Sequence, residues 1–144
     1  MMRQFCVLGE SLPHTISPTI HQRLFELSEK KGDYSILELT PDQLLTQTDF
    51  LKSFAGYNVT IPHKVKIIPF IDKLDASAKR YGAINCVHNI DGISTGYNTD
   101  VVGFLRALES GGGNLGGKVL LLGCGGAGRM MAIETALADS NLTI

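Results

Sequence analysis

A glycine-rich segment between residues 111 and 128 constrains the fold more than any other feature of this sequence. It holds nine of the 16 glycines in the chain, and its last residues, Gly123-Cys124-Gly125-Gly126-Ala127-Gly128, follow the pattern GxGxxG. The run KVLLLG that leads into the pattern predicts a buried strand, and the residues after it predict a helix over 127–138. A strand, a glycine turn and a helix in this order are typical of the first βα unit of a Rossmann fold.

The glycines of this turn suit the pyrophosphate of a dinucleotide. The first permits a tight turn, the second lets backbone N–H groups approach the phosphates, and the third lets the helix pack closely on the strand. A purely structural turn is the alternative, because the bare pattern is weak. The charged residue that distinguishes NAD from NADP is expected about 20 residues further on, where this sequence ends, so the pattern leaves the cofactor open. The expected cofactor-binding residues are Gly123, Gly125, Gly126, Ala127 and Gly128.

The change in composition near residue 110 predicts a boundary between a first domain, residues 1–110, and the beginning of a second, residues 111–144. In the first domain short apolar runs alternate with helical patterns, which indicates the α/β class with a mainly parallel sheet flanked by helices. The turn signal Asp91-Gly92 predicts a hairpin between the last two of these runs. The expected strands are residues 5–10, 34–39, 56–61, 83–90 and 93–97.

Helix starts are marked by a hydroxyl residue placed before a proline. Ser17-Pro18 and Thr40-Pro41 both have this form, with the hydroxyl expected to cap the helix. A further helix is expected to open at Thr99, which would cap it. The first helix carries an apolar stripe, which predicts a half-buried face, at Ile20, Leu24 and Leu27.

Composition excludes several classes of function. The 13 Lys and Arg residues are scattered and balanced by 14 Asp and Glu residues, which disfavours a nucleic acid partner. The three cysteines are widely spaced, which favours a reducing, cytoplasmic location over a disulfide framework. The histidines lack metal-ligand spacing, so no metal is expected. No window approaches the roughly 18 uninterrupted apolar residues of a membrane span, so no membrane partner is expected either.

Polar residues gather where two expected strands end, which is where open α/β sheets bind ligands. The first segment is NVTIPHK, residues 58–64, and the second is GYNTD, residues 96–100. Lys64 and Asp100 would make an acid/base pair, in which the amine exchanges a proton with a substrate hydroxyl and the carboxylate orients it. Taken singly, Lys64 fits a solvated lysine, and Asp100 fits a first-turn carboxylate stabilised by the helix dipole.

Two further pairs of polar residues are candidates for substrate binding. The hydroxyls of Thr15 and Ser17 suit a substrate carboxylate, although Ser17 already serves as an expected helix cap. Asn58 and Thr60 share one face of their strand, an arrangement that a solvated polar face would also show.

Five motifs occur in a recognisable order: HTISPTIH, NVTIPHK, GAINCV, GYNTDVVGF and GCGGAGR. Through them essentially the whole chain resembles the shikimate dehydrogenase family, and NVTxPxK followed by GxNTDxxG is the specific part. The resemblance implies an N-terminal domain that binds shikimate and a C-terminal Rossmann domain that binds NADP, with NAD as the other option. It also implies reversible reduction of 3-dehydroshikimate to shikimate by hydride transfer, a step of aromatic amino acid biosynthesis.

The resemblance assigns roles to particular residues. Lys64 would exchange the proton of the reacting hydroxyl, and Asp100 would orient Lys64 and hydrogen-bond that hydroxyl. The glycine turn would face the pyrophosphate. Together with this pair, the residues that would hold the ring hydroxyls and carboxylate of the substrate are Thr15, Ser17, Asn58, Thr60 and Asn85.

Two departures from the family pattern bear on specificity and on activity. Thr15 stands where the family usually has serine, which bears on the choice between shikimate and quinate, and Cys86 replaces a threonine with a weaker hydrogen-bonding group. A quinate/shikimate dehydrogenase and a non-catalytic sensor of these acids are therefore the alternatives, and the presence of both Lys64 and Asp100 argues against the sensor. Much of the cofactor domain is expected after Ile144, so we expect these residues alone to show little dehydrogenase activity.

Overall fold

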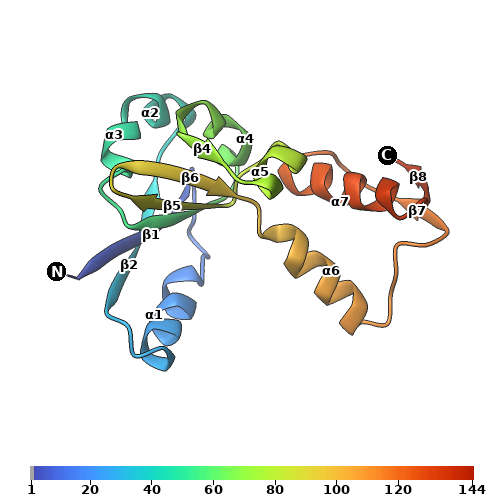
Figure 1. The fold of residues 1–144 in the computed structure, drawn as a ribbon, viewed down its shortest axis with the longest axis horizontal. Coiled ribbons are helices and arrows are strands. Elements are labelled where there is room, and N and C mark those ends of the chain that lie inside the picture. The colour runs from blue at the N-terminus through green and yellow to red at the C-terminus, as the bar shows by residue number, and fades with distance from the viewer. Residues whose placement is uncertain (1) are drawn as a thin grey trace.

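The computed structural model describes residues 2–144 and contains two sheets (Figure 1). The larger sheet has six strands in the order β2-β1-β3-β5-β6-β4. Along the chain these are β1 (Arg3–Gly9), β2 (Gly32–Glu38), β3 (Gly56–Val59), β4 (Lys73–Leu74), β5 (Cys86–Ile90) and β6 (Ile93–Tyr97). The smaller sheet pairs β7 (Lys118–Leu120) with β8 (Asn141–Thr143) in parallel.

The six-stranded sheet is mixed but mainly parallel, as predicted. Strand β1 is parallel to both β2 and β3, and β4 is parallel to β6. Strand β5 runs antiparallel to β3 and to β6, and the β5–β6 pair is the predicted hairpin. Its turn residues Asp91 and Gly92 both have positive φ, 50° and 77°, which is the conformation that two-residue hairpin turns require.

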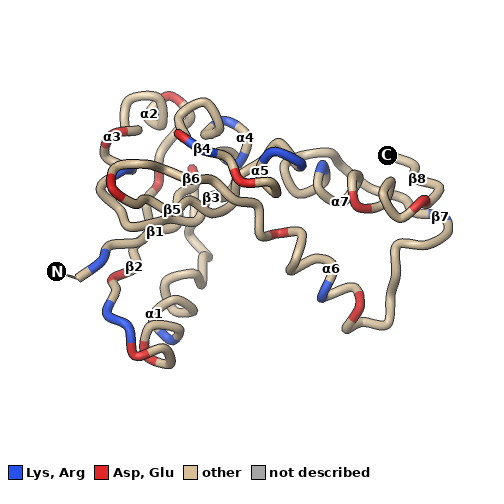
Figure 2. Tube along the Cα trace, viewed as in Figure 1, with Lys and Arg blue, Asp and Glu red and all other residues tan. Residues whose placement is uncertain are grey.

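Helices cover the large sheet and lead from it to the small one. In chain order they are α1 (Ser17–Leu27), α2 (Pro41–Thr46), α3 (Thr48–Leu51), α4 (His63–Lys66), α5 (Ala76–Tyr81), α6 (Asp100–Ser110) and α7 (Gly126–Leu137). Figure 1 shows α6 leaving the large sheet, and α7 running from beside α5 toward the small sheet. Acidic and basic residues are interspersed along the trace (Figure 2).

The main core lies between the large sheet and helices α2 to α5. Leu8 and Val59 contribute from adjacent parallel strands, and Leu44 contributes from α2. A second, smaller core lies where α5, α6 and α7 meet, and it contains Tyr81, Val101 and Met130. Helix α5 lies between β4 and β5 of the large sheet, α6 follows β6, and α7 connects the two strands of the small sheet, so this second core joins the two parts.

The start of α2 is predicted correctly, whereas the start of α1 is not. At α2 the Thr40 hydroxyl accepts a hydrogen bond from the Gln43 N–H, and the Gln43 side chain accepts one from the Thr40 N–H. At α1 the N-cap is Ile16, and Ser17 already lies inside the helix.

The apolar stripe of α1 is exposed, contrary to the prediction of a half-buried face. Ile20, Leu24 and Leu27 are 46%, 51% and 65% exposed. The helix contacts the sheet instead through His21, which stacks on Tyr34, and Phe25, which packs on Phe5. Because successive residues of a helix are separated by about 100°, a contact face set by these two aromatic rings turns the neighbouring stripe away.

The strand β7 is also less buried than KVLLLG suggests. Leu120 and the following Leu122 are both mostly exposed. Among the described residues β7 pairs only with β8, and the contacts with that small sheet come from α7. Successive residues of a strand point to opposite faces of the sheet. A sheet that is contacted on one face therefore leaves the side chains of its other face exposed to solvent.

Candidate functional site

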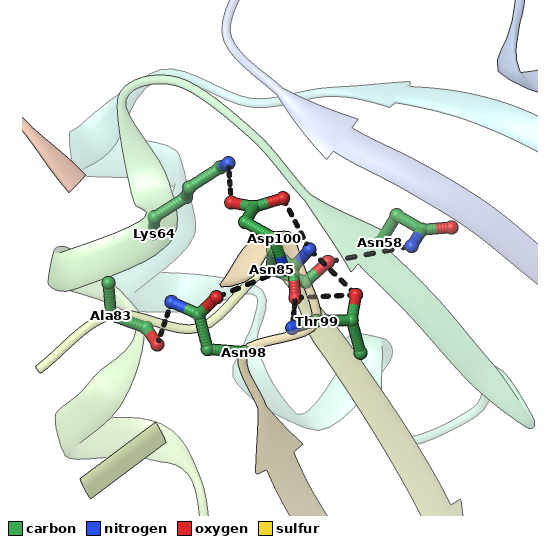
Figure 3. A network of polar contacts seen from close by, with 7 residues as sticks. All are labelled: Asn58, Lys64, Ala83, Asn85, Asn98, Thr99 and Asp100. Atoms are coloured by element: carbon green, nitrogen blue, oxygen red, sulfur yellow. Dashed lines mark hydrogen bonds and ion pairs between the residues drawn. The ribbon is translucent and has the colours of Figure 1, made fainter. Parts of the chain in front are cut away.

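Lys64 and Asp100 form the centre of the site (Figure 3). The Lys64 Nζ donates a hydrogen bond to Asp100 Oδ2 over 2.6 Å, which is also an ion pair. Lys64 comes from the short helix α4 after β3, and Asp100 is the first residue of α6 after β6. The two side chains are 18% and 28% exposed, so solvent reaches the pair but does not surround it.

Asn85 holds the other carboxylate oxygen. Its Nδ2 donates to Asp100 Oδ1 over 2.7 Å and to Thr99 Oγ1 over 2.9 Å. Its Oδ1 in turn accepts a hydrogen bond of 2.8 Å from the Thr99 N–H. Both oxygens of Asp100 therefore have donors, and the carboxylate is held in one orientation toward Lys64.

Asn98 secures the beginning of α6. Its Oδ1 accepts from the Asp100 N–H over 3.1 Å, and its Nδ2 donates to the Ala83 carbonyl over 3.2 Å. The side chain is only 3% exposed. Thr99 occupies the N-cap position as predicted, but its hydroxyl makes no cap hydrogen bond and contacts Asn85 instead. Asn98 thus supplies the acceptor that the expected cap does not.

Asn58 extends the polar network toward α1. Its Oδ1 accepts from the Tyr34 hydroxyl over 2.6 Å, and its Nδ2 lies 3.5 Å from the Asn85 carbonyl. Burial raises the pKa of Tyr34, so its hydroxyl keeps the proton that it donates. The Tyr34 ring stacks on His21 with 3.9 Å between ring centroids, and His21 Nδ1 lies 2.8 Å from the Ser17 carbonyl oxygen.

The two expected carboxylate-binding hydroxyls lie side by side. Thr15 Oγ1 donates to Ser17 Oγ over 3.2 Å and accepts from the Ser17 N–H over 3.3 Å. A path of contacts leads from the Ser17 carbonyl through His21 and Tyr34 to Asn58, and from there through Asn85 to the Lys64–Asp100 pair. Tyr34, His21 and Asn98 were missed by sequence reasoning, and the clue to His21 was its position one helical turn after Ser17.

A cavity of about 620 Å³ lies between the two parts of the chain. One wall contains Thr60 and Lys64, and the opposite wall contains Met131 and the turn from Gly123 to Gly128. A Cβ added to Gly126 would lie 3.4 Å from the Lys64 Cβ, so the turn comes close to the acid/base pair. The volume of the cavity falls within the range of about 300–1,000 Å³ that is usual for small-molecule sites.

The glycine turn has the shape that a pyrophosphate requires. Gly123 has a φ of +97°, which favours glycine, and a Cβ at Gly128 would collide with the Gly123 carbonyl. The N-cap of α7 is Gly125, and no side chain caps the helix. The first N–H groups of the helix lack a side-chain partner, which is the usual arrangement at an anion site. These residues fit a dinucleotide.

Two other features, a metal site and a membrane-spanning helix, are not found among residues 2–144. No group of three His, Cys, Asp or Glu residues lies close enough to hold a metal ion. Within the same residues no helix is both long and apolar enough to cross a membrane.

Residues 7–87 match the family model described as the shikimate dehydrogenase substrate binding domain. The chain belongs to the shikimate dehydrogenase family. Among curated relatives, the shikimate dehydrogenase (NADP(+)) of Lysinibacillus sphaericus is 42% identical over 137 residues, which cover 92% of this chain and 50% of the relative. That of Moorella thermoacetica is 41% identical over 135 residues, covering 92% and 46%.

Solved structures of the family share the fold. A shikimate dehydrogenase of Peptoclostridium difficile matches with a TM-score of 0.94 at 30% identity, over 98% of this chain and 55% of that one. A shikimate 5-dehydrogenase of Thermus thermophilus, in complex with NADP(H) and shikimate, matches with a TM-score of 0.86 at 34% identity, over 98% and 54%. The predicted family and fold class are confirmed, and the chain spans about half the length of these relatives.

Proposed function

We propose that this chain carries the substrate site and the acid/base groups of an NADP-dependent shikimate dehydrogenase. In this proposal residues 1–110 form the shikimate-binding domain and residues 111–144 begin the cofactor domain. The observation that carries it is that Lys64, which is ion-paired with Asp100 over 2.6 Å, lines the same cavity as the glycine turn. The names of the curated relatives, shikimate dehydrogenase (NADP(+)), support the same reaction.

Lys64 is the proposed acid in the reduction of 3-dehydroshikimate. Its ammonium group donates a proton to the substrate oxygen as the carbonyl becomes a hydroxyl, and in the reverse direction the amine takes that proton back. When bound, the nicotinamide cofactor supplies or accepts the hydride. Asp100 accepts a hydrogen bond from Lys64 and keeps the amine directed at the reacting oxygen, while Asn85 holds the carboxylate from the other side.

The remaining polar groups are proposed to hold the substrate and the cofactor. Glycines 123, 125, 126 and 128, with Ala127, receive the pyrophosphate at the start of α7. The free cysteines suit a reducing compartment, so we expect the protein in the cytoplasm. The substrate carboxylate and ring hydroxyls are assigned to Thr15, Ser17, Asn58, Thr60 and Asn85.

Calorimetric titration of this chain with shikimate, and with quinate as competitor, tests the proposed substrate. Binding of shikimate in preference to quinate is the expected result. A preference for quinate would assign the site to a quinate dehydrogenase, and a Thr15→Ser variant then shows whether the extra methyl of Thr15 causes it. Binding of neither acid would contradict the proposal that these residues carry the substrate site.

The catalytic role of Lys64 is tested with Lys64→Met and with Lys66→Met as its matched control. Both residues are lysines of α4, and Lys66 is exposed. NADPH formation from shikimate should fall by about 10²–10⁴-fold in Lys64→Met, the usual contribution of acid/base catalysis, and stay unchanged in Lys66→Met. Equal rates in the two variants would refute the assigned role.

A further inference from the structure

One partly buried hydrogen bond connects the two parts of the chain outside the cavity. The Tyr81 hydroxyl, at the end of α5, donates to Glu134 Oε1 on α7 over 2.6 Å. Tyr81 is only 4% exposed. Its ring packs with Val101 and Met130 in the small core between α5, α6 and α7. The bond therefore lies next to this small core of Tyr81, Val101 and Met130, which joins the two parts and is called the seam below.

On the substrate side, the chain segment that follows Tyr81 runs directly into the site. After Tyr81 the chain turns at Gly82, which has a φ of +58°, and reaches Asn85 three residues later. Within this short stretch the Ile84 N–H donates to the Lys64 carbonyl over 2.7 Å, and the Ala83 carbonyl accepts from Asn98. A shift of Tyr81 would therefore be passed to residues that hold Lys64 and Asp100.

On the cofactor side, Glu134 belongs to the helix that begins at the glycine turn. Helix α7 runs from Gly126 to Leu137, and its first residue lies close to the Lys64 side chain. Because a helix moves as a rigid element, a bond near its far end limits how its first turn can move relative to Lys64. Arg129 lies between, with its guanidinium near Gly82, and lines the outer side of the same seam.

We propose that Tyr81 and Glu134 are positioning residues that hold the glycine turn at a fixed distance from Lys64 across the cavity. This inference rests on the proposed function, in which hydride transfer needs the nicotinamide and the substrate in contact. The hydrogen bond is short and its acceptor is charged, a combination that makes strong hydrogen bonds in a partly buried place. Burial, followed by the Glu134 contact, raises the pKa of Tyr81, which keeps the donor protonated.

Opening of the seam is measured by labelling a cysteine placed inside it. Met130 is 1% exposed, so Met130→Cys, in a chain whose exposed Cys124 is changed to Ser, reacts only when the seam opens. Adding Tyr81→Phe removes the hydrogen bond and keeps the ring, and should speed labelling at position 130 about tenfold. Cys6, fully buried in the main core, reports opening of the large sheet and should keep its rate.

Further variants distinguish the effect of the Tyr81–Glu134 hydrogen bond on the labelling rate from the effect of side-chain packing. Glu134→Gln keeps an acceptor oxygen and should change the labelling rate less than Glu134→Leu does. Tyr57→Phe removes a buried hydroxyl from the main core and should leave labelling at position 130 unchanged. Equal labelling in Tyr81→Phe and its parent, or a parallel rise at Cys6, would overturn the proposal.

Ligand binding then shows whether the seam serves the reaction. In the chain with native cysteines, Tyr81→Phe should leave the affinity for shikimate within about twofold and weaken NADP⁺ binding at saturating shikimate by about tenfold. Equal loss of both affinities would indicate a general structural role and overturn the proposal. If labelling responds as expected but the chain binds neither ligand, the positioning pair stands and the proposed function fails.

Discussion

Replacement of Asn98 by alanine should damage both the stability of the fold and the substrate site. The Asn98 side chain makes two hydrogen bonds, one from the Asp100 N–H and one to the Ala83 carbonyl. It is buried, so alanine leaves both backbone groups without a side-chain partner. At about 1–1.5 kcal/mol for each lost bond, the free energy of unfolding should fall by about 2–3 kcal/mol.

Asn89→Ala is the matched control for this prediction. The Asn89 Nδ2 also makes two hydrogen bonds, to the carbonyls of Leu51 and Phe54, in a part of the large sheet away from Lys64. Both variants should lose similar stability. Only Asn98→Ala should release the start of α6, let Asp100 turn away from Lys64 and weaken shikimate binding, by about tenfold for one lost orienting hydrogen bond.

The two effects are measured separately. Urea unfolding followed by far-ultraviolet circular dichroism suits a chain without tryptophan, and with a slope of about 2 kcal/mol per molar the midpoint should fall by about 1–1.5 M in both variants. Calorimetry at low temperature, where both variants stay folded, gives the shikimate affinity. If Asn98→Ala binds shikimate as well as Asn89→Ala does, Asn98 does not orient Asp100.

Three other predictions concern thiols, pH and helix stability. Burial raises the pKa of Cys6 to about 12, so a thiol reagent at pH 8 should modify the exposed Cys124 rapidly and leave Cys6 intact until the chain unfolds, as site-resolved mass spectrometry would show. Gly103→Ala, in α6, meets no atom within 4 Å and should raise the free energy of unfolding in urea by about 0.5–1 kcal/mol. Unfolding free energy should fall as the pH rises above about 8.5, where unfolded cysteines lose their protons, and more steeply above about 10, where unfolded tyrosines do, because the folded chain keeps these protons. Urea titrations at pH 8 and 11 measure the summed effect of the groups whose pKa is raised, Cys6, Cys86, Tyr34, Tyr57 and Tyr81.

Local signals predicted the parts of the fold whose geometry depends on neighbouring residues. The Asp91-Gly92 turn, the helix cap by the Thr40 hydroxyl and the glycine turn before α7 all formed as expected. Each is a short segment in which the residue type determines the backbone conformation directly. The resemblance of the whole chain then pointed to Lys64 and Asp100, and the fold brings these residues together from 36 positions apart.

The contacts that α1 and Tyr34 make with distant segments were not predictable from the sequence. The helical spacing of Ile20, Leu24 and Leu27 correctly indicated a helix, but the aromatic contacts of His21 and Phe25 decide which face packs on the sheet. Tyr34 is a strand tyrosine with no distinguishing neighbours in the sequence. Its hydroxyl becomes part of the site only because β2, which carries Tyr34, and β3, which carries Asn58, both pair in parallel with β1, so that the Tyr34 hydroxyl lies 2.6 Å from Asn58 Oδ1.

At the start of α6, the N-cap residue Thr99 takes part in the site instead of capping the helix. Thr99 stands where a hydroxyl normally accepts from a helical N–H, yet it exchanges hydrogen bonds with Asn85, which in turn orients Asp100. The helix keeps its acceptor because Asn98, one residue earlier, receives the Asp100 N–H. Departures from local rules are expected where a site requires them, provided that a neighbour compensates. Thr99→Ala should therefore weaken shikimate binding through Asn85 and lower the unfolding free energy less than Asn98→Ala does, whereas equal destabilisation would show that the Thr99 hydroxyl supports the helix after all.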